Sequence, residues 1–460
     1  MRATGRDKTT NPQELNKQLE RLQSENERLK RENERLREEL EKALRLARRQ
    51  AAPFSRGEPK AKPKRPGRKP GARYGTHQRR HPPSQVDEAI AVPMPECCMC
   101  GGTATFERTE VQYQEDIVIR TVRRRFDIGI GRCACCGRTV QGRDALQTSD
   151  ALGAASVQIG PAALSLAGLM TKQMGLSVGN AQQILEVGCG LRMSRGGLSR
   201  ALGRMARKAE PVYAQLLAAN RASVVNVMDE TGWKVGGRLE WAHVAVGERT
   251  TVYAILPGRG YAQSVELIGS DYGGFLLRDG WAPYRRFREA FHQTCLGHLL
   301  RRSKEMEKAG GAAAAFPRSV KELLKRALGL RDRYQANRIS ERGLARARGK
   351  LEAAMDRLLD QPLSSEADRK LARHLSNERE HLFPFLYCPG LAATNHQAER
   401  ALRGLVIARK VWGGNRTAAG ARTQSVLMSV LRTCRQQGVS PMAWLMSLLC
   451  SAQPVLLPLT

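Results

Sequence analysis

Leucine recurs every seven residues near the start of the chain. One heptad position holds leucine four times and a second position holds leucine or asparagine: Leu15, Leu22, Leu29 and Leu36, then Leu19, Asn26, Asn33 and Leu40. Almost all other positions are charged or amide side chains, so this helix has one narrow apolar seam that a partner helix would bury. Residues 1–50 are therefore predicted to form a leucine-zipper coiled coil, and the seam asparagines favour a parallel dimer. A single amphipathic helix docked on its own domain is the alternative.

The hydrophobic pattern stops after residue 50. Residues 51–85 contain ten Lys or Arg and one acid, with seven Pro and four Gly, a composition that cannot form a packed core. We expect residues 51–90 to be a disordered basic linker. Its central cations are candidates for contacts in a DNA minor groove: Lys64, Arg65, Arg68 and Lys69. A solvated linker that attracts DNA non-specifically is the alternative.

Two cysteine pairs with matching spacing follow the linker. Six of the eleven cysteines lie between residues 97 and 136, and two pairs have two intervening residues and a trailing glycine: Cys97 with Cys100, and Cys133 with Cys136. An alternating segment from Phe106 to Ile130 is predicted to be a β-hairpin joining the pairs. Four thiolates so arranged predict a structural Zn²⁺ site in a small β zinc-binding domain over residues 91–150. Free thiols or a redox pair are the alternative.

Helical periodicity dominates residues 151–220. Apolar side chains recur at three- and four-residue spacing, and glycine pairs divide the segment into short helices. The stretch from Ser194 to Arg200 precedes the last helix and is compatible with a helix-turn-helix that reads DNA. Ordinary packing helices are the alternative, so the segment is a helical DNA-binding or connector region.

Strand-like runs replace helices after residue 222. They are Ser223–Asp229, Leu239–Val246, Thr250–Leu256 and Gly274–Asp279. A three-stranded meander followed by a crossover to a fourth strand matches the ribonuclease H-like α/β arrangement. There the first and fourth strands lie side by side, so carboxylates at their ends, Asp229 and Asp279, converge.

A third carboxylate is needed to hold two hard cations. Glu399 is the best candidate, because it lies on a predicted helix and shares a face with Asn395. Taken singly, Asp229 could be a turn residue and Glu399 a charge at the end of a helix. The occurrence of all three acids in this predicted arrangement favours a Mg²⁺ site. Between Asp279 and Glu399 lie 119 residues, and apolar spacing predicts helices there. The chain is thus predicted to be a multidomain α+β protein. Its catalytic domain is expected in two parts, 221–302 and 391–450, the second including C-terminal helices, around a helical insertion at 303–390.

The net charge of the chain indicates the class of its binding partner. The 460 residues contain 76 Lys or Arg and 44 Asp or Glu, a formal charge of +32, which favours a polyanion such as nucleic acid. No long apolar run and no secretory h-region occur. We therefore expect a cytoplasmic protein with no membrane partner.

Several linked motifs make a resemblance specific. They are Asp229-Glu-Thr-Gly-Trp, Arg278-Asp-Gly-Trp-Ala-Pro-Tyr284, Cys295-Leu-Gly-His-Leu-Leu-Arg301, Asn395-x3-Glu-Arg-x2-Arg403 and Arg409-Lys-x-Trp412. In this order they resemble the transposases of the insertion-sequence-66 family over nearly the whole chain. The resemblance implies a catalytic domain of the Asp-Asp-Glu type with a helical insertion and the acidic triad Asp229, Asp279 and Glu399. It also implies accessory proteins of the same element as partners. Gly297 departs from the bulkier residue expected there, which puts no catalytic group in doubt.

The expected function is DNA transposition by two-metal chemistry. Two Mg²⁺ ions on the triad would support cleavage at the element ends and joining of the 3′ ends to target DNA, with a homodimer or higher oligomer formed through the coiled coil. Phosphate and base contacts are expected from Arg400, Arg403, Arg409, Lys410 and Trp412, although Trp412 could equally be a core residue. Cys295 and His298 are interpreted as structural, with a second zinc site or a DNA contact as alternatives. The competing functions are a non-catalytic zinc-containing DNA-binding regulator and a nuclease of the same fold without strand transfer.

Overall fold

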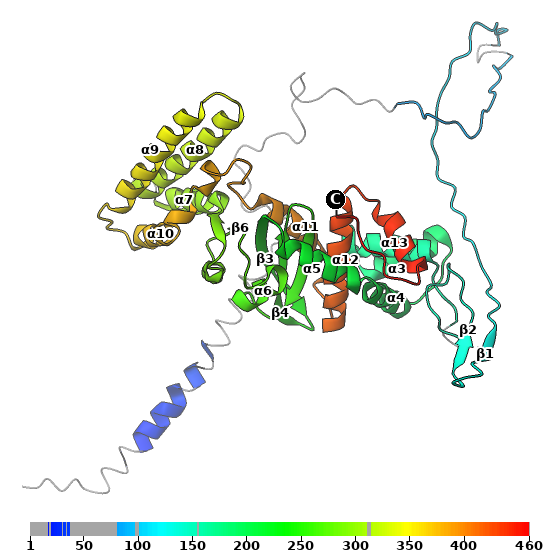
Figure 1. Ribbon diagram of the computed structural model, residues 1–460, viewed down its shortest axis with the longest axis horizontal. Helices are drawn as coiled ribbons and strands as arrows, with labels where there is room; N and C mark the ends of the chain where they lie inside the picture. Colours follow the sequence, from blue (N-terminus) through cyan, green and yellow to red (C-terminus); the bar gives the residue numbers. More distant parts are fainter. Residues whose placement is uncertain are drawn as a thin grey trace, which may run out of the picture. The chain divides into compact units, whose positions relative to one another are not determined.

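The computed structural model (Figure 1) describes residues 17, 20–29, 31–33, 35–36, 81–96, 101–153, 156–310 and 314–459. The chain divides into two compact units, Met1–Ile117 and Val118–Thr460, which are treated separately below. No helix in these described ranges has both the length and the apolar character needed to cross a bilayer.

The first unit contains the heptad segment. Residues 20–29 and 31–33 are helical, and Leu22, Leu29 and Leu36 are 64%, 50% and 55% exposed. The predicted seam is therefore solvent-facing within one chain, as a coiled-coil surface awaiting a partner helix would be; the dimer itself stays a prediction. Asn26 and Asn33 of the predicted seam are also helical and exposed. The remaining leucines of the pattern and the linker cations lie outside the described residues: Leu15, Leu19, Leu40, Lys64, Arg65, Arg68 and Lys69.

The hairpin predicted between Phe106 and Ile130 is wrong. Residues 104–129 contain no strand, and apolar side chains such as Val111 and Val118 are 74% and 92% exposed. Alternation alone does not make a strand, because the backbone needs a pairing partner and the apolar face needs a core. In the second unit, β1 (Ile130–Arg132) and β2 (Thr139–Gln141) form a short antiparallel ladder instead.

That ladder encloses the second cysteine pair. Cys133 N–H donates to the Arg138 carbonyl at 2.8 Å, and Gly137 N–H donates to the Cys133 carbonyl at 2.9 Å, with Gly137 at φ +67°. The trailing glycine thus adopts the left-handed conformation expected of a knuckle turn. Cys97 and Cys100 lie outside the described residues, so the four-thiolate zinc site remains a prediction.

Helices precede the sheet, as the periodicity predicted. They are α2 (Pro161–Gly168), the π-helical η3 (Leu169–Gln173), α3 (Val178–Cys189), α4 (Arg195–Lys208) and α5 (Glu210–Arg221). The Ser194 hydroxyl caps α4 by accepting from Gly197 N–H at 3.0 Å. Leu198, Leu202 and Met205 are each at most 1% exposed within one core cluster, so this face of α4 packs inside the protein.

A five-stranded mixed sheet forms the centre of the second unit. Its strands are β3 (Val225–Val235), β4 (Arg238–Val246), β5 (Thr251–Leu256), β6 (Phe275–Arg278) and β7 (Phe291–Thr294), in the order β5-β4-β3-β6-β7. β3 pairs antiparallel with β4 and parallel with β6, and β6 pairs parallel with β7. The mixed α+β class and the adjacency of the first and fourth predicted strands are thereby confirmed. The edge strand β7 was not predicted.

β3 is longer than expected. The sequence predicted a strand ending at Asp229, whereas the structure continues it to Val235, so Asp229 lies within the strand. The continuation is stabilised by cross-strand pairs such as Thr231 with Ala242 and Trp233 with Glu240. Gly232 lies within this continuation and pairs with Trp241 of β4.

Helices fill the interval between β7 and the last part of the chain. They are α7 (Leu296–Gly310), α8 (Ala315–Gln335), α9 (Glu341–Leu359) and α10 (Glu366–Asn377), followed by the 3₁₀ turns η6 (Arg379–His381) and η7 (Pro384–Leu386). They have their own core, which includes Val320, Met355 and Leu371. In Figure 1 the helices α8, α9 and α10 lie together, away from α12 and α13. The predicted helical insertion is therefore a bundle with its own core, which also packs against Val225 and Phe275 of the sheet.

The remaining elements pack on the sheet or, for α13, on the helices α2, α4 and α12. They are α6 (Tyr261–Ile268), the 3₁₀ turn η4 (Ala282–Arg286), α11 (His396–Trp412), α12 (Ala418–Gln436) and α13 (Pro441–Cys450). One core cluster joins Val227 and Trp233 of β3 to Ala401 and Leu405 of α11. A second cluster joins Met228 to residues of α6 and η4. Alternate β3 side chains therefore face different layers.

Candidate active site

Strand alternation places Asp229 on the face of the sheet that α11 covers. It shares this face with Val227 and Trp233, whose cluster includes α11. Its carboxylate accepts a hydrogen bond from Glu230 N–H at 2.9 Å. No ion pair joins Asp229 to a basic side chain in the part of the chain that the structure describes. Asp229 is therefore a partly buried acid without a cationic partner.

Asp279 reaches the same region from the neighbouring strand. β3 and β6 are in parallel register from Val225 with Phe275 to Val227 with Leu277, and continuing that register by two residues brings Asp279 beside Asp229. The Asp279 carboxylate accepts from Trp281 N–H at 2.9 Å, which fixes the turn after β6. Asp279 thus leaves the end of a buried strand in a defined direction.

Glu399 is brought in by the first turn of α11. Two contacts dock the residues before this helix onto the start of α7: Leu296 N–H donates to the Ala393 carbonyl at 2.9 Å, and Asn395 N–H to Cys295 Sγ at 3.3 Å. Glu399 Oε1 then lies 3.7 Å from His298 Nε2 and 3.5 Å from an Arg301 nitrogen. The buried Cys295 therefore has a structural role, and His298 contacts the third acid of the predicted triad.

Electrostatics show that the three acids share one region. Burial, together with the charges of Glu230, Asp279 and Glu399, raises the pKa of Asp229 to about 8, although the hydrogen bond from Glu230 N–H opposes the shift. Carboxylates that interact in this way would gain from a cation between them. Among the described residues, no three His, Cys, Asp or Glu side chains form a ready-made metal-binding group, so the carboxylates would have to draw closer to share an ion.

Glu230 is an acid that the sequence analysis missed. Burial raises its pKa to about 7, although the Tyr284 hydroxyl, which donates to Glu230 Oε2 at 2.5 Å, opposes the shift. It lies on the opposite face of β3 from Asp229, with Tyr284 in the Met228 cluster. The sequence shows Glu230 directly after Asp229, and Tyr284 closes the motif that contains Asp279. Glu230 was overlooked because the strand was expected to end at Asp229.

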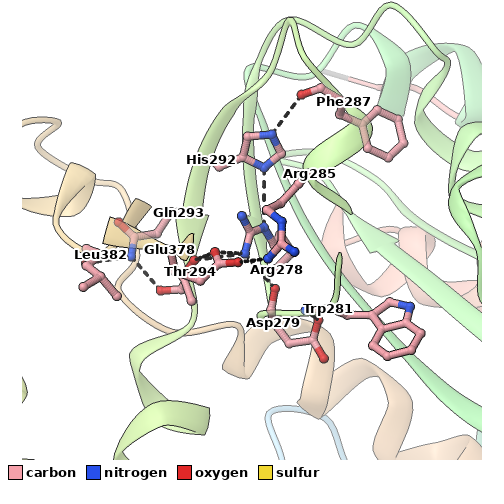
Figure 2. A network of polar contacts seen from close by, with 10 residues as sticks. All are labelled: Arg278, Asp279, Trp281, Arg285, Phe287, His292, Gln293, Thr294, Glu378 and Leu382. Carbon is pink, nitrogen blue, oxygen red and sulfur yellow. Dashed lines mark hydrogen bonds and ion pairs between the residues drawn. The ribbon is translucent and has the colours of Figure 1, made fainter. Parts of the chain in front are cut away.

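A buried ion-pair network lies directly behind Asp279 (Figure 2). Arg278 and Glu378, both 0% exposed, form an ion pair, and Glu378 also accepts from Arg285 at 2.7 Å and from the Thr294 hydroxyl at 2.6 Å. Arg278 additionally donates to the Asp279 carbonyl at 3.0 Å. Because Glu378 follows α10, the network ties the helical insertion to the residue before Asp279.

Backbone packing reinforces this tie. At Gly280, a Cβ atom would collide with the imidazole ring of His374 on α10, so glycine permits α10 to approach the Asp279 turn. Gly297, which departs from the family pattern, is less constrained: a Cβ there would lie 3.4 Å from Cys295 Sγ and 3.7 Å from Thr394, ordinary contact distances. Gly280 is thus the glycine that matters for the site.

The candidate DNA contacts fall into two groups. Arg400, Arg403 and Lys410 are exposed on α11. Arg409 instead turns toward β3, where it donates to the Thr231 hydroxyl at 3.1 Å and to the Gly232 carbonyl. Trp412 packs edge-on against Trp233 with ring centroids 5.4 Å apart, and its indole N–H donates to the Gly175 carbonyl at 3.0 Å. It is thus partly buried against the core.

Comparison with known proteins agrees with this architecture. A family model described as Transposase IS66 family matches residues 158–423. A stretch of 65 residues, 14% of the chain, is 37% identical to the Sinorhizobium fredii protein named Uncharacterized protein y4hP and spans 12% of that protein. The matched family region contains the whole mixed sheet and all three acids, and the chain belongs to the IS66 family of transposases.

Proposed function

We propose that the chain cleaves the ends of an insertion element and joins the freed 3′ ends to target DNA, using Asp229, Asp279 and Glu399. The observation that supports this most directly is the electrostatic convergence of the three acids around Asp229. The strand order β5-β4-β3-β6-β7, with an acid on the central strand and another after its parallel neighbour, is also that of ribonuclease H-like nucleases and transposases.

The donor set fits a hard divalent cation. All three candidate ligands are carboxylates, the oxygen donors that Mg²⁺ prefers. Asn395, fully buried and four residues before Glu399, has a side-chain oxygen with no hydrogen-bond partner in the described structure, so it is a spare acceptor close to the site. Two bound Mg²⁺ ions would activate the attacking water or 3′-hydroxyl and stabilise the leaving 3′ oxygen.

The protein's own groups position the reaction. Asp229 lies on a paired strand, and Asp279 directly follows another paired strand in a turn fixed by the Trp281 N–H bond, which limits their movement. Glu399 is oriented by His298 and Arg301 on α7. Arg400 and Arg403, exposed next to Glu399, would bind the phosphates that flank the scissile bond.

The cleavage assay tests the proposal. The full chain with Mg²⁺ and element-end DNA should nick the end and join it to a target, and Asp229→Asn, Asp279→Asn or Glu399→Gln should each reduce cleavage at least about 10³-fold. DNA affinity should change less than twofold in each variant. Asp360→Asn, which removes an exposed acid on the insertion, is the matched control and should cleave normally.

Other outcomes assign other functions. Nicking without joining would indicate a nuclease of the same fold, and DNA binding with neither reaction would indicate a regulator. The remaining parts of the proposal have separate tests on the full chain. Metal analysis should find one zinc per chain that Cys133→Ser removes, and sedimentation should show a dimer that Leu22→Lys with Leu29→Lys dissociates.

A further inference from the structure

A cavity of about 610 Å³ opens on the sheet face that carries Asp229. Its walls come from the start of β3, the turn between β4 and β5, the first turns of α11 and the last turn of α12. The volume is within the range of about 300–1,000 Å³ that is typical of ligand sites. It is therefore large enough for a nucleotide-sized part of a ligand.

The cavity is lined by three arginines from two helices. They are Arg400 of α11 and Arg432 and Arg435 of α12, and the single acid in the lining is Glu248. Within the described ranges, none of the three guanidinium groups makes a hydrogen bond or an ion pair. Three unpaired guanidinium groups facing one space indicate an anionic ligand, for which arginine offers paired donors that match phosphate oxygens.

The rest of the lining is fixed and partly apolar. Gln436 donates to the Gly247 and Glu248 carbonyls at 2.9 and 3.0 Å and accepts from the Thr251 hydroxyl at 2.7 Å, so it holds the β4–β5 turn in place. Val227 and Val246 contribute an apolar floor. A cationic rim over such a floor suits a ligand that combines phosphates with a flat apolar group, as a nucleotide does.

None of the three acids lines the cavity, but two of its lining residues lie close in the sequence to Asp229 and Glu399. Arg400 directly follows Glu399, and Val227 precedes Asp229 by two residues on the same strand face. We propose that this cavity binds the phosphodiester backbone of the DNA strand that enters the acidic site, with one base against the apolar floor. The inference rests on the proposed function, because it names the strand path of that same site.

The test compares two double variants of the full chain. Arg432→Ala with Arg435→Ala removes two cavity charges, and Arg326→Ala with Arg346→Ala removes two exposed charges from the insertion bundle. Affinity for an end-sequence oligonucleotide is measured in EDTA over a range of salt concentrations. The cavity variant should bind about tenfold more weakly, and its slope of log affinity against log salt concentration should correspond to about two fewer phosphate contacts. The affinity of the control variant should change less than twofold. Equal losses in the two variants would overturn the proposal.

A local readout separates DNA from small anions. In the wild-type chain, the oligonucleotide should protect Arg432 and Arg435 from phenylglyoxal modification, as measured by mass spectrometry, while Arg326 remains reactive. Equal protection by inorganic phosphate at the same phosphate concentration would overturn the assignment to a DNA strand. Because neither measurement uses Mg²⁺ or cleavage, a failure of the cavity proposal leaves the cleavage assay intact, and absence of cleavage leaves these binding results interpretable.

Discussion

Two acids close to Asp279 have opposite environments. For Asp229, burial and the neighbouring acids Glu230, Asp279 and Glu399 together raise the pKa to about 8. For Glu378, burial also favours the neutral form, but the charge of Arg278 and hydrogen bonds from Thr294, Arg278 and Arg285 outweigh it and hold the pKa below its usual value. One buried acid is surrounded by negative charge and the other by positive charge.

The difference between the two environments indicates a structural role for Glu378 and a functional role for Asp229. Glu378 is already neutralised by the protein, so it has no capacity left for an external cation and instead holds two segments together. Asp229 has no protein cation, so folding leaves an electrostatic cost that a divalent ion would relieve. The four predictions below test this contrast, from the largest expected effect to the smallest.

The largest effect is expected from breaking the buried pair. Glu378→Gln leaves the Arg278 charge buried without a counter-ion, so the free energy of unfolding should fall by about 3–5 kcal/mol. Urea unfolding followed by circular dichroism measures the loss. Glu380→Gln changes an exposed acid two residues away and should cost less than about 0.5 kcal/mol. Equal stability of the two variants would show that the network contributes little.

A second variant of the pair sharpens this result. Replacing both partners, by Arg278→Met with Glu378→Leu, removes the uncompensated charge and should recover much of the lost stability. If the double variant is as unstable as Glu378→Gln, the loss of unfolding free energy comes from altered packing and not from the unpaired charge.

Asp229→Asn should stabilise the metal-free protein, in contrast to Glu378→Gln. Because the folded pKa of Asp229 is raised to about 8 from about 3.9 in the unfolded chain, the wild-type acid costs stability increasingly as pH rises between these values. The gain from asparagine should therefore be about 3 kcal/mol larger at pH 8.5 than at pH 5.5. Thermal unfolding in EDTA at the two pH values measures it. A gain that does not grow with pH would contradict the assigned environment.

Gly280→Ala tests the packing of the insertion against the Asp279 turn. The new methyl group would meet the His374 ring, so unfolding free energy should fall by about 1–3 kcal/mol, and cleavage should fall with it because Asp279 is displaced. Gly329→Ala on α8, where a Cβ meets nothing within 4 Å, should be neutral or slightly stabilising. If both variants behave alike, the contact with α10 does not constrain the turn.

The smallest stability effect is expected at Arg301. Its contact with Glu399, at 3.5 Å, is solvent-exposed, so Arg301→Gln should change unfolding free energy by less than about 0.5 kcal/mol. Cleavage should fall several-fold if Arg301 orients Glu399. If Arg301→Gln cleaves as fast as the wild-type chain and the Asp360→Asn control, His298 and not Arg301 orients Glu399.

The sequence predicted the elements that carry strong periodicity. The meander, the adjacency of β3 and β6 and the insertion helices all follow from local patterns and general connection rules. β7 was missed because Phe291–Thr294 is short and three of its four residues are polar. The hairpin between Phe106 and Ile130 was wrongly expected because alternation does not reveal whether a partner strand exists.

The candidate site was predictable only in part. Asp229, Asp279 and Glu399 stood out through their motifs, whereas Glu378 lies at the end of an ordinary polar helix, and nothing local links it to Arg278, 100 residues earlier. Long-range pairs of this kind depend on how separate segments dock, which periodicity does not encode. Arg432 and Arg435 were missed for the same reason, because only the packing of α12 on the sheet brings them to the cavity.

The Arg278–Glu378 pair also has a consequence for how the protein is made. During synthesis, β6 emerges well before residue 378, so Arg278 cannot be desolvated favourably until the ribosome has released the end of α10. The parallel strands β3, β6 and β7 should therefore assemble late, together with the bundle, in one cooperative event. A fragment that ends before residue 378 is expected to expose its strands and aggregate.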